Sequence, residues 1–367
     1  MTAATPKPLP TIADYGPNAI EVKGLTFGYN SGGSAIVNSD VKSVLHNLTL
    51  TLATGSRCLL IGSNGRYVNV YRQMETLLFL LVLTCLHQSL CSGKSTLLRI
   101  LAGRHLTQQE VRVLGLNSFR DTKLNFHRAY LDTDWGMTSI AFVGASVPLM
   151  ADIPVHKMME KLQQSYPERR DELVKMLGID LNWRMCHLSD GQRRRVQLML
   201  GLIRPFKVLL LDEVTTSLDV CVRQDLLKWL IRESDDRKAT ILYATHIFDG
   251  LDDWATHLFY LTNRGQCGWQ GKMDELEVYQ TLKRENHPAK MLAIAEHWLR
   301  KELEEAREMG KFERAQLDHM ECDPTDRQGG YASGRNIPLD AITGTQARQG
   351  RLSDIMGNAG VLAKHHN

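Results

Sequence analysis

The stretch that decides the fold is NLTLTLATGSRCLLIG, residues 47–62, together with SGKSTLLRILAG, residues 92–103. The first part has two β-type runs on either side of a turn at residues 54–56, which predicts two strands. The second part has apolar residues at helical spacing and ends at Gly103, which favours a helix with a glycine C-cap. A strand, a glycine-rich turn beginning at Gly62 and a helix, in this order, are the elements of a phosphate-binding site.

The phosphate-binding residues are present in two halves. Such a loop turns backbone N–H groups toward the phosphates and supplies a lysine for the β/γ-phosphates and a hydroxyl for Mg²⁺. The first half ends the strand and the second half opens the helix: Gly62, Ser63, Asn64 and Gly65, then Ser92, Gly93, Lys94, Ser95 and Thr96. Joined directly, they read GSNGSGKST, a full Walker A motif. We therefore expect ATP and Mg²⁺ as the cofactors, with Ser95 as a metal ligand.

Residues 66–91 separate the two halves. The second half cannot serve alone, because the motif requires a glycine six residues before Lys94 and Gln88 occupies that position. One interpretation is a functional insertion, a short apolar helical excursion that leaves Gly65 and Ser92 one peptide step, about 3.8 Å, apart. The entropic cost of closing such a loop is tolerable, because this cost grows only logarithmically with the length of the loop. Its bulk would nevertheless lie at the phosphate site.

We favour a second interpretation, in which this segment is a retained intron. Codons for Arg66-Tyr67-Val68 can contain a splice donor (AG|GTAYGTN), and codons for Cys91-Ser92 can contain an acceptor (TGCAG|N). The segment is a whole number of codons, and its Phe/Leu-rich run suits a pyrimidine tract. Splicing would restore GSNGSGKST. In the chain as written we expect weak or absent ATP binding, because the loop and Lys94 are not preorganised together.

A pair of carboxylates follows an apolar run in VLLLDE, residues 208–213. The run is typical of a buried parallel strand. At the end of such a strand, Asp212 could hold the Mg²⁺ shell and Glu213 could act as a general base toward water. Taken alone, the pair is better explained as two solvated acids at a strand end, so the assignment depends on the surrounding motifs.

Three further motifs surround these carboxylates. LSDGQ precedes them at Leu188–Gln192, and Ser217–Asp219 and Thr245–His246 follow them. In this order the set resembles the signature motif, Walker B, D-loop and switch histidine of the nucleotide-binding domain of ABC-type ATPases. The resemblance implies an α/β fold of the ABC-type P-loop NTPase class, with a mostly parallel core sheet, an antiparallel β subdomain and a helical subdomain.

The resemblance also implies a mechanism. Two domains face each other head to tail, and ATP lies between the Walker motifs of one domain and the signature loop of the other. That loop contributes Ser189, Gly191 and Gln192, while Glu213 and His246 are the implied catalytic residues. Hydrolysis of ATP to ADP and phosphate would then require a homodimer or a heterodimer with another ABC protein.

Two further positions bear on this resemblance. Tyr29 ends the first predicted strand and matches the aromatic residue that stacks on adenine in the family, although simple packing would also explain it. Within the stretch SIAFVGASVPL, residues 139–149, Ala145 occupies the position of the glutamine that family members usually have in the loop after this strand, and alanine can contact neither Mg²⁺ nor lytic water. In transporters that loop meets the membrane subunits, so the departure weakens the transporter hypothesis.

Residues 181–197, 204–219 and 239–258 resemble one branch of the family, the ABC ATPases without transmembrane domains. This branch includes plant subfamily I members and a fungal relative associated with the Ccr-Not complex, and the similarity spans about residues 20–305 outside residues 66–91. It implies a regulatory, cytoplasmic ATPase, with the nucleus as a second location and a Ccr-Not type complex as a candidate partner. The alternatives are a nucleotide-dependent or nucleotide-dead interaction scaffold and the ATPase subunit of a membrane transporter.

Local patterns predict the domain organisation. A helix over residues 289–317 is predicted to pack on the domain through the face that carries Leu292, Ala295, Leu299, Leu303 and Ala306. The predicted parts are a disordered lead-in (1–19), the ATPase domain (20–288) with the insertion (66–91) and a helical subdomain (150–187), the helix (289–317) and a disordered tail (318–367).

Composition excludes several classes. Apolar residues make up 43% of the 367 residues and charged residues 23%, which is typical of a folded protein. The 44 Lys and Arg are scattered among 41 Asp and Glu, so charge alone indicates neither nucleic acid nor a membrane surface. The apolar run at residues 76–86 is shorter than the ~20 residues that span a bilayer. Seven cysteines without a CxxC pair favour a reducing, intracellular compartment.

Overall fold

The computed structural model describes residues 16–29, 43–62, 93–132 and 152–319. Several sequence predictions lie outside these residues: those for Ser63, Asn64, Gly65, Ser92 and Ala145, for the segment 66–91, for the lead-in up to residue 15 and for the tail from residue 320. Within the described residues, no helix is long and apolar enough to cross a membrane.

A mostly parallel sheet positions the predicted Walker residues. Its strand order is β10-β9-β3-β8-β7-β6, and every neighbouring pair is parallel except β10 with β9. The strands are β3 (Arg57–Gly62), β6 (Arg128–Leu131), β7 (Val208–Asp212), β8 (Thr240–Ala244), β9 (His257–Leu261) and β10 (Cys267–Lys272). Strands β7 and β8 are buried along their whole length, as expected of parallel strands covered on both faces.

A second, antiparallel sheet has the order β2-β1-β4-β5. Its strands are β1 (Asn18–Gly28), β2 (Ser43–Ala53), β4 (Val111–Val113) and β5 (Leu116–Asn117). Strand β1 begins at Asn18, two residues before the predicted start of the domain at residue 20. Along much of β1 and β2, buried apolar residues alternate with more exposed polar residues, because one face of this sheet covers the core.

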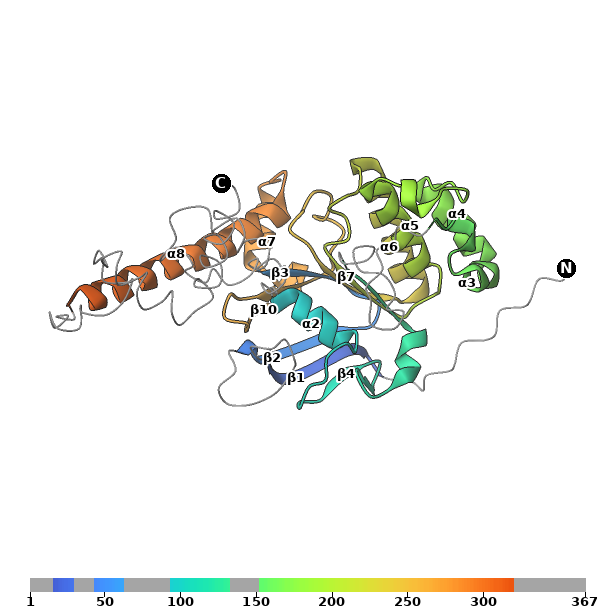
Figure 1. The fold of residues 1–367 in the computed structure, drawn as a ribbon. Helices are drawn as coiled ribbons and strands as arrows, with labels where there is room; N and C mark the ends of the chain where they lie inside the picture. Colours follow the sequence, from blue (N-terminus) through green and yellow to red (C-terminus); the bar gives the residue numbers. More distant parts are fainter. Residues whose placement is uncertain (1–15, 30–42, 63–92, 133–151, 320–367) are drawn as a thin grey trace, which may run out of the picture. The chain divides into compact units, whose positions relative to one another are not determined.

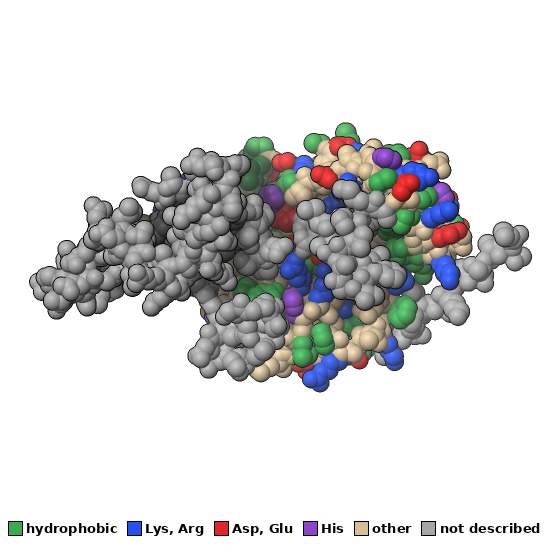
Figure 2. All heavy atoms as spheres, viewed as in Figure 1, with side chains coloured by type: hydrophobic (Ala, Val, Ile, Leu, Met, Phe, Trp, Pro, Cys, Tyr) green, Lys and Arg blue, Asp and Glu red, His purple; other side chains and the backbone are tan. Residues whose placement is uncertain are grey.

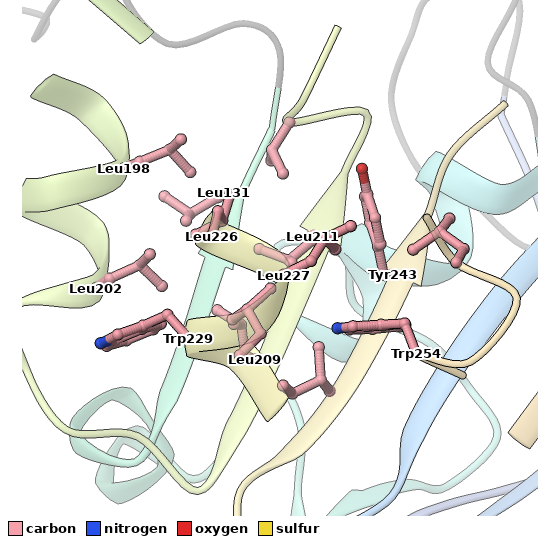
Figure 3. Packing of buried hydrophobic residues seen from close by; sticks show 14 of the residues in the cluster. Leu131, Leu198, Leu202, Leu209, Leu211, Leu226, Leu227, Trp229, Tyr243 and Trp254 are labelled. Atoms are coloured by element: carbon pink, nitrogen blue, oxygen red, sulfur yellow. The ribbon is translucent and has the colours of Figure 1, made fainter. Parts of the chain in front are cut away.

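Alternate residues of the parallel sheet enter two separate cores. Leu60 and Leu210 pack with the antiparallel sheet and with α2 (Gly93–Leu101), which lies between the two sheets (Figure 1). Leu59 and Leu209 belong to the other core, which includes Trp229 and Trp254 and is shown in Figure 3. This alternation follows from the two-residue period of a strand, and it keeps α2 and the strand ends in a defined arrangement.

Helices cover the other face of the parallel sheet. They are α3 (Glu160–Ser165), α4 (Pro167–Leu177), α5 (Asp190–Leu202) and α6 (Val220–Arg237). Two later helices, α7 (Glu277–Arg284) and α8 (Lys290–His319), contribute Tyr279, Met291 and Ile294 to the same core. Short 3-10 helices lie at Thr122–Phe126, Val155–Lys157, Met185–His187 and Met273–Glu275. Tyr166 separates α3 from α4, which starts with a proline that has no N–H to leave unpaired.

On the face shown in Figure 2, basic and acidic side chains of the described residues are interspersed.

The packing face of α8 differs from the predicted one. The chain divides into two compact units, of which the first ends at Leu303. Within the first unit, Met291 and Ile294 are buried, whereas Leu292 is 50% exposed and Leu303 is 39% exposed. The predicted face was therefore wrong for the two leucines. The physical reason is Trp298, whose ring stacks on Tyr260 of β9 at 4.5 Å between centroids and sets the rotation of the helix.

Candidate functional site

Two predicted catalytic residues meet at the carboxyl ends of neighbouring parallel strands. Asp212 ends β7 opposite Ala244, the last residue of β8. The next residue, Glu213, donates its backbone N–H to the Ala244 carbonyl at 2.9 Å. The Glu213 carboxylate then contacts His246, with Oε2 2.8 Å from Nδ1 and 3.4 Å from the backbone nitrogen. The structure thus brings the predicted base and the predicted switch histidine into direct contact.

Glu213 has a strained backbone. Its φ is +51°, in the left-handed region, where the Cβ of an L-residue is crowded. Such a conformation costs of order 1–3 kcal/mol and persists only where the surrounding structure enforces it. Here the backbone bond to Ala244 and the side-chain contact with His246 hold the residue. The chain thus leaves the extended conformation of β7 directly after Asp212.

Lys94 and Asp212 form the buried charged part of the site. The Lys94 side chain is 3% exposed, and its Nζ donates to the carbonyl of Gly62 at 2.6 Å. Burial lowers the pKa of Lys94 to about 8, although the nearby negative charges of Glu213 and Asp212 oppose the shift. Burial also raises the pKa of Asp212 to about 6, against a hydrogen bond from Ser95 and with the added repulsion of Glu213. Both shifts follow from the burial of these side chains, since Asp212 is only 5% exposed.

The oxygen atoms of Ser95 and Asp212 suit Mg²⁺. This ion prefers hard oxygen ligands, takes one or two from the protein, and completes its shell with water and phosphate oxygens. Ser95 donates to the Asp212 carboxylate, so the two side chains already lie within reach of a common ion. A cation there would also relieve the unfavourable burial of the carboxylate. No cluster of three or more His, Cys, Asp or Glu in the described residues could hold a metal by itself.

Gly62 joins β3 to the phosphate loop by a close backbone approach. A Cβ at this position would lie 2.5 Å from the carbonyl oxygen of Leu261, the last residue of β9, so only glycine fits. On the other side of the loop, Gly93 begins α2 and places Thr96 in the buried interior. Of the nine predicted Walker A residues, the structure describes five: Gly62, Gly93, Lys94, Ser95 and Thr96.

Tyr29 lies beside the buried face of α2. Its hydroxyl donates to Thr96 Oγ1 at 3.4 Å and lies 3.2 Å from Nε2 of His105. The aromatic residue predicted for adenine and a Walker A threonine are therefore neighbours. His105 was not among the predicted site residues, because a histidine in a loop after a helix carries no motif.

The signature residues form a separate group at the start of α5. Ser189 and Gln192 make a reciprocal capping box: Ser189 Oγ accepts from the Gln192 N–H at 3.3 Å, and Gln192 Oε1 accepts from the Ser189 N–H at 3.0 Å. Gly191 lies against the D-loop, because a Cβ there would be 3.0 Å from the carbonyl oxygen of Ser217. Asp219 of the D-loop also pairs with an arginine of the same helix, Arg195.

Asp132 is a further buried carboxylate that sequence reasoning missed. It follows β6, next to β7, and is 6% exposed. Its Oδ2 accepts from Arg104 at 2.7 Å, and its carbonyl accepts from Arg194 at 2.5 Å and Gln197 at 2.9 Å. It is one of the charges that raise the pKa of Asp212. Its place directly after a strand was the one available signal.

Comparisons with known proteins agree with this architecture. The family model for ABC transporters matches residues 91–216, so the match begins where the separating segment ends. ABC transporter I family member 20 of Arabidopsis thaliana is 40% identical over 301 residues, which cover 81% of each chain. CCR4-associated factor 16 of Saccharomyces cerevisiae is 34% identical over 259 residues, covering 66% of this chain and 75% of the yeast protein.

Solved structures show the same fold at low identity. An ATP-binding subunit of an ABC transporter superimposes with a TM-score of 0.52 at 18% identity, covering 72% of this chain and 93% of that one. A bacterial Atm1-family ABC exporter with ATP bound gives 0.53 at 19% identity, over 82% of this chain and 44% of the exporter. The predicted fold class is confirmed. The chain therefore belongs to the ABC family, in the branch that includes the plant I-family members and CCR4-associated factor 16.

Proposed function

We propose that this protein binds Mg-ATP and hydrolyses it to ADP and phosphate as a dimer. The observation that carries the proposal is the contact between Glu213 and His246, beside Asp212 and Lys94, at the carboxyl ends of parallel strands. Ligands of open α/β sheets bind at this edge. Membership of the ABC family, whose domains are ATPases in general, supports the same chemistry.

Each residue has a distinct role in the proposed reaction. The Lys94 ammonium binds the β/γ-phosphates, and Asp212 with Ser95 would hold Mg²⁺, which neutralises phosphate charge when bound. The Glu213 carboxylate orients the attacking water and takes its proton. His246 holds this carboxylate in place through Oε2. Lys94 and Asp212 are buried, and such low exposure to solvent strengthens electrostatic interactions with the phosphates.

A second copy, or another ABC protein, would complete the site. Ser189 is exposed at the N-terminus of α5, where the helix dipole and free N–H groups favour an anion. The signature loop of Ser189, Gly191 and Gln192 would therefore bind the γ-phosphate of ATP held by its partner. Light scattering of the Glu213→Gln variant with residues 66–91 deleted, in the presence of Mg-ATP, tests this step. A monomer at saturating ATP would contradict it.

Turnover of Glu213→Gln against the parent, with residues 66–91 deleted from both proteins, tests the enzymatic proposal. Loss of a general base lowers the rate by about 10²–10⁴-fold. We expect steady-state phosphate release to fall by at least 100-fold while ATP binding remains. Glu277→Gln, an exposed acid at the start of α7, is the matched control and should keep the parental rate. Equal rates for the Glu213→Gln variant and the parent would refute the assignment.

The separated Walker A halves call for a second experiment. The affinity of the full chain for ATP is compared with that of a variant lacking residues 66–91, in which Gly65 and Ser92 are joined. We expect binding to be at least tenfold tighter in the deletion variant, because its loop amides and Lys94 are held together. Equal affinities would show that the segment does not disturb the nucleotide site.

A regulatory role, as opposed to transport, is the biological part of the proposal. It is supported by the name of the yeast relative, CCR4-associated factor 16, which also suggests a partner of the Ccr-Not type. We propose the cytoplasm, and additionally the nucleus, as its location. Affinity purification of the deletion variant, followed by mass spectrometry, tests the partner. Recovery of a membrane permease instead would favour the ATPase subunit of a transporter.

The interrupted phosphate loop favours a second candidate function, a nucleotide-dead scaffold. In that case the full chain binds its partner without ATP, and Glu213→Gln leaves the binding unchanged. An ATP-dependent interaction that responds to Glu213→Gln would reject the scaffold.

A further inference from the structure

His105 and Tyr29 form an aromatic cluster at the side of the nucleotide site. The two rings meet at 82° with 5.5 Å between centroids, and Phe27 contacts Tyr29 at 90° and 5.2 Å and His105 at 36° and 5.5 Å. The Tyr29 hydroxyl lies 3.2 Å from His105 Nε2 and 3.4 Å from Thr96 Oγ1. A phenol hydroxyl donates one hydrogen bond and also accepts, so it can serve both partners at once.

The position of Tyr29 in the chain makes these contacts important. Tyr29 directly follows Gly28, the last residue of β1 that pairs with β2. The Tyr29 side chain contacts Phe27, Thr96 and His105, and these contacts contribute to the orientation of the phenol ring.

We propose that His105 is a positioning residue for the purine base of the nucleotide, which it fixes by holding the Tyr29 ring in its stacking orientation. The inference rests on the proposed function, because it refines how ATP is bound. His105 lies in the loop after α2, the helix that carries Lys94 and Ser95. Its contact with Tyr29 therefore links the base end of the site to the phosphate end.

The environment of His105 suits this role. The imidazole is half-buried, and burial together with the charges of Arg99 and Arg104 holds its pKa below the ordinary value. A neutral imidazole has one donor and one acceptor nitrogen. Because the Tyr29 hydroxyl donates its hydrogen to Thr96, it accepts from His105 in the tautomer that carries the proton on Nε2.

The test compares two ligands, Mg-ATP and inorganic tripolyphosphate, which has the phosphates without the base. Binding is measured by calorimetry with the full chain and with the variant lacking residues 66–91. We expect His105→Ala to weaken ATP binding by about tenfold, equivalent to 1.4 kcal/mol, and to leave tripolyphosphate binding unchanged. Unchanged tripolyphosphate binding also shows that the variant is folded. His105→Gln should restore most of the ATP affinity, because its amide can reach the hydroxyl.

A double-mutant cycle with Tyr29→Phe completes the design. If His105 acts through the tyrosine hydroxyl, His105→Ala should have less than half of its effect in the Tyr29→Phe background. Equal losses for ATP and tripolyphosphate, or ATP affinity unchanged by His105→Ala, would overturn the inference while leaving the proposed function intact. Failure of both parent proteins to bind ATP would instead overturn the proposed function.

Discussion

The strained backbone of Glu213 leads to a prediction about stability that is separate from catalysis. Replacement by alanine and by glycine removes the same carboxylate and the same contact with His246, so the two variants differ only in backbone preference. At an ordinary position glycine is less stable than alanine by about 0.5–1 kcal/mol. At φ +51° an L-residue is disfavoured by about 1–2 kcal/mol. We therefore expect Glu213→Gly to be more stable than Glu213→Ala by about 0.5–1 kcal/mol.

Urea unfolding followed by tryptophan fluorescence measures this difference, because Trp229 and Trp254 are buried in the core beside the sheet. Lys228 on α6 is the matched control, since it is exposed and lies within a regular helix. There the order should be reversed, with Lys228→Gly less stable than Lys228→Ala by about 1 kcal/mol. An alanine variant at position 213 as stable as the glycine variant would refute the claim of backbone strain. Glu213→Ala and Glu213→Gly should both lose ATP turnover, because each removes the carboxylate.

Three further predictions concern other parts of the chain. Asp212→Asn should raise the unfolding free energy at pH 8 by about 2–3 kcal/mol, since two pKa units correspond to that energy. Burial raises the pKa of Asp212 from 3.8 to about 6, so folding takes up a proton between pH 4 and pH 6. The stability gained by Asp212→Asn should therefore vanish below pH 4, and a gain that does not change with pH would contradict the prediction. Arg169 and Glu233 form a buried bidentate pair at 2.7 and 2.8 Å. Arg169→Met should lower the free energy of unfolding by about 3–5 kcal/mol, because it leaves the buried Glu233 carboxylate unpaired. The double variant Arg169→Met/Glu233→Leu should lose less stability, and urea unfolding measures both changes. Sequencing the coding DNA should find AGG for Arg66 and TGC for Cys91; a CGN codon or TGT would end the intron hypothesis.

Much of the local structure was predictable because it follows from short-range patterns. The apolar run before Asp212 is a buried strand, and the apolar spacing after Lys94 is a helix. Tyr166 and Pro167 mark the predicted break between two helices. Hydrophobic period and capping chemistry act within a few residues, so they can be read without knowledge of the fold.

The orientation of α8 could not be predicted in the same way. Its sequence carries apolar residues on more than one face, and periodicity alone favoured the face with Leu292 and Leu303. The stack of Trp298 on Tyr260 selected another rotation, although the two residues are 38 positions apart. Which of two apolar faces is buried depends on the shape of the surface that receives it.

By itself, the sequence predicted the identity and order of the candidate site residues, including Lys94, Asp212, Glu213 and His246, because each lies in a motif of local chemistry. Only the tertiary structure decided how they meet. Glu213 and His246 are 33 residues apart, and the parallel pairing of β7 and β8 places them in contact. The contact between His105 and Tyr29 has the same physical reason: α2 packs on the antiparallel sheet, and no pattern within either segment records that contact.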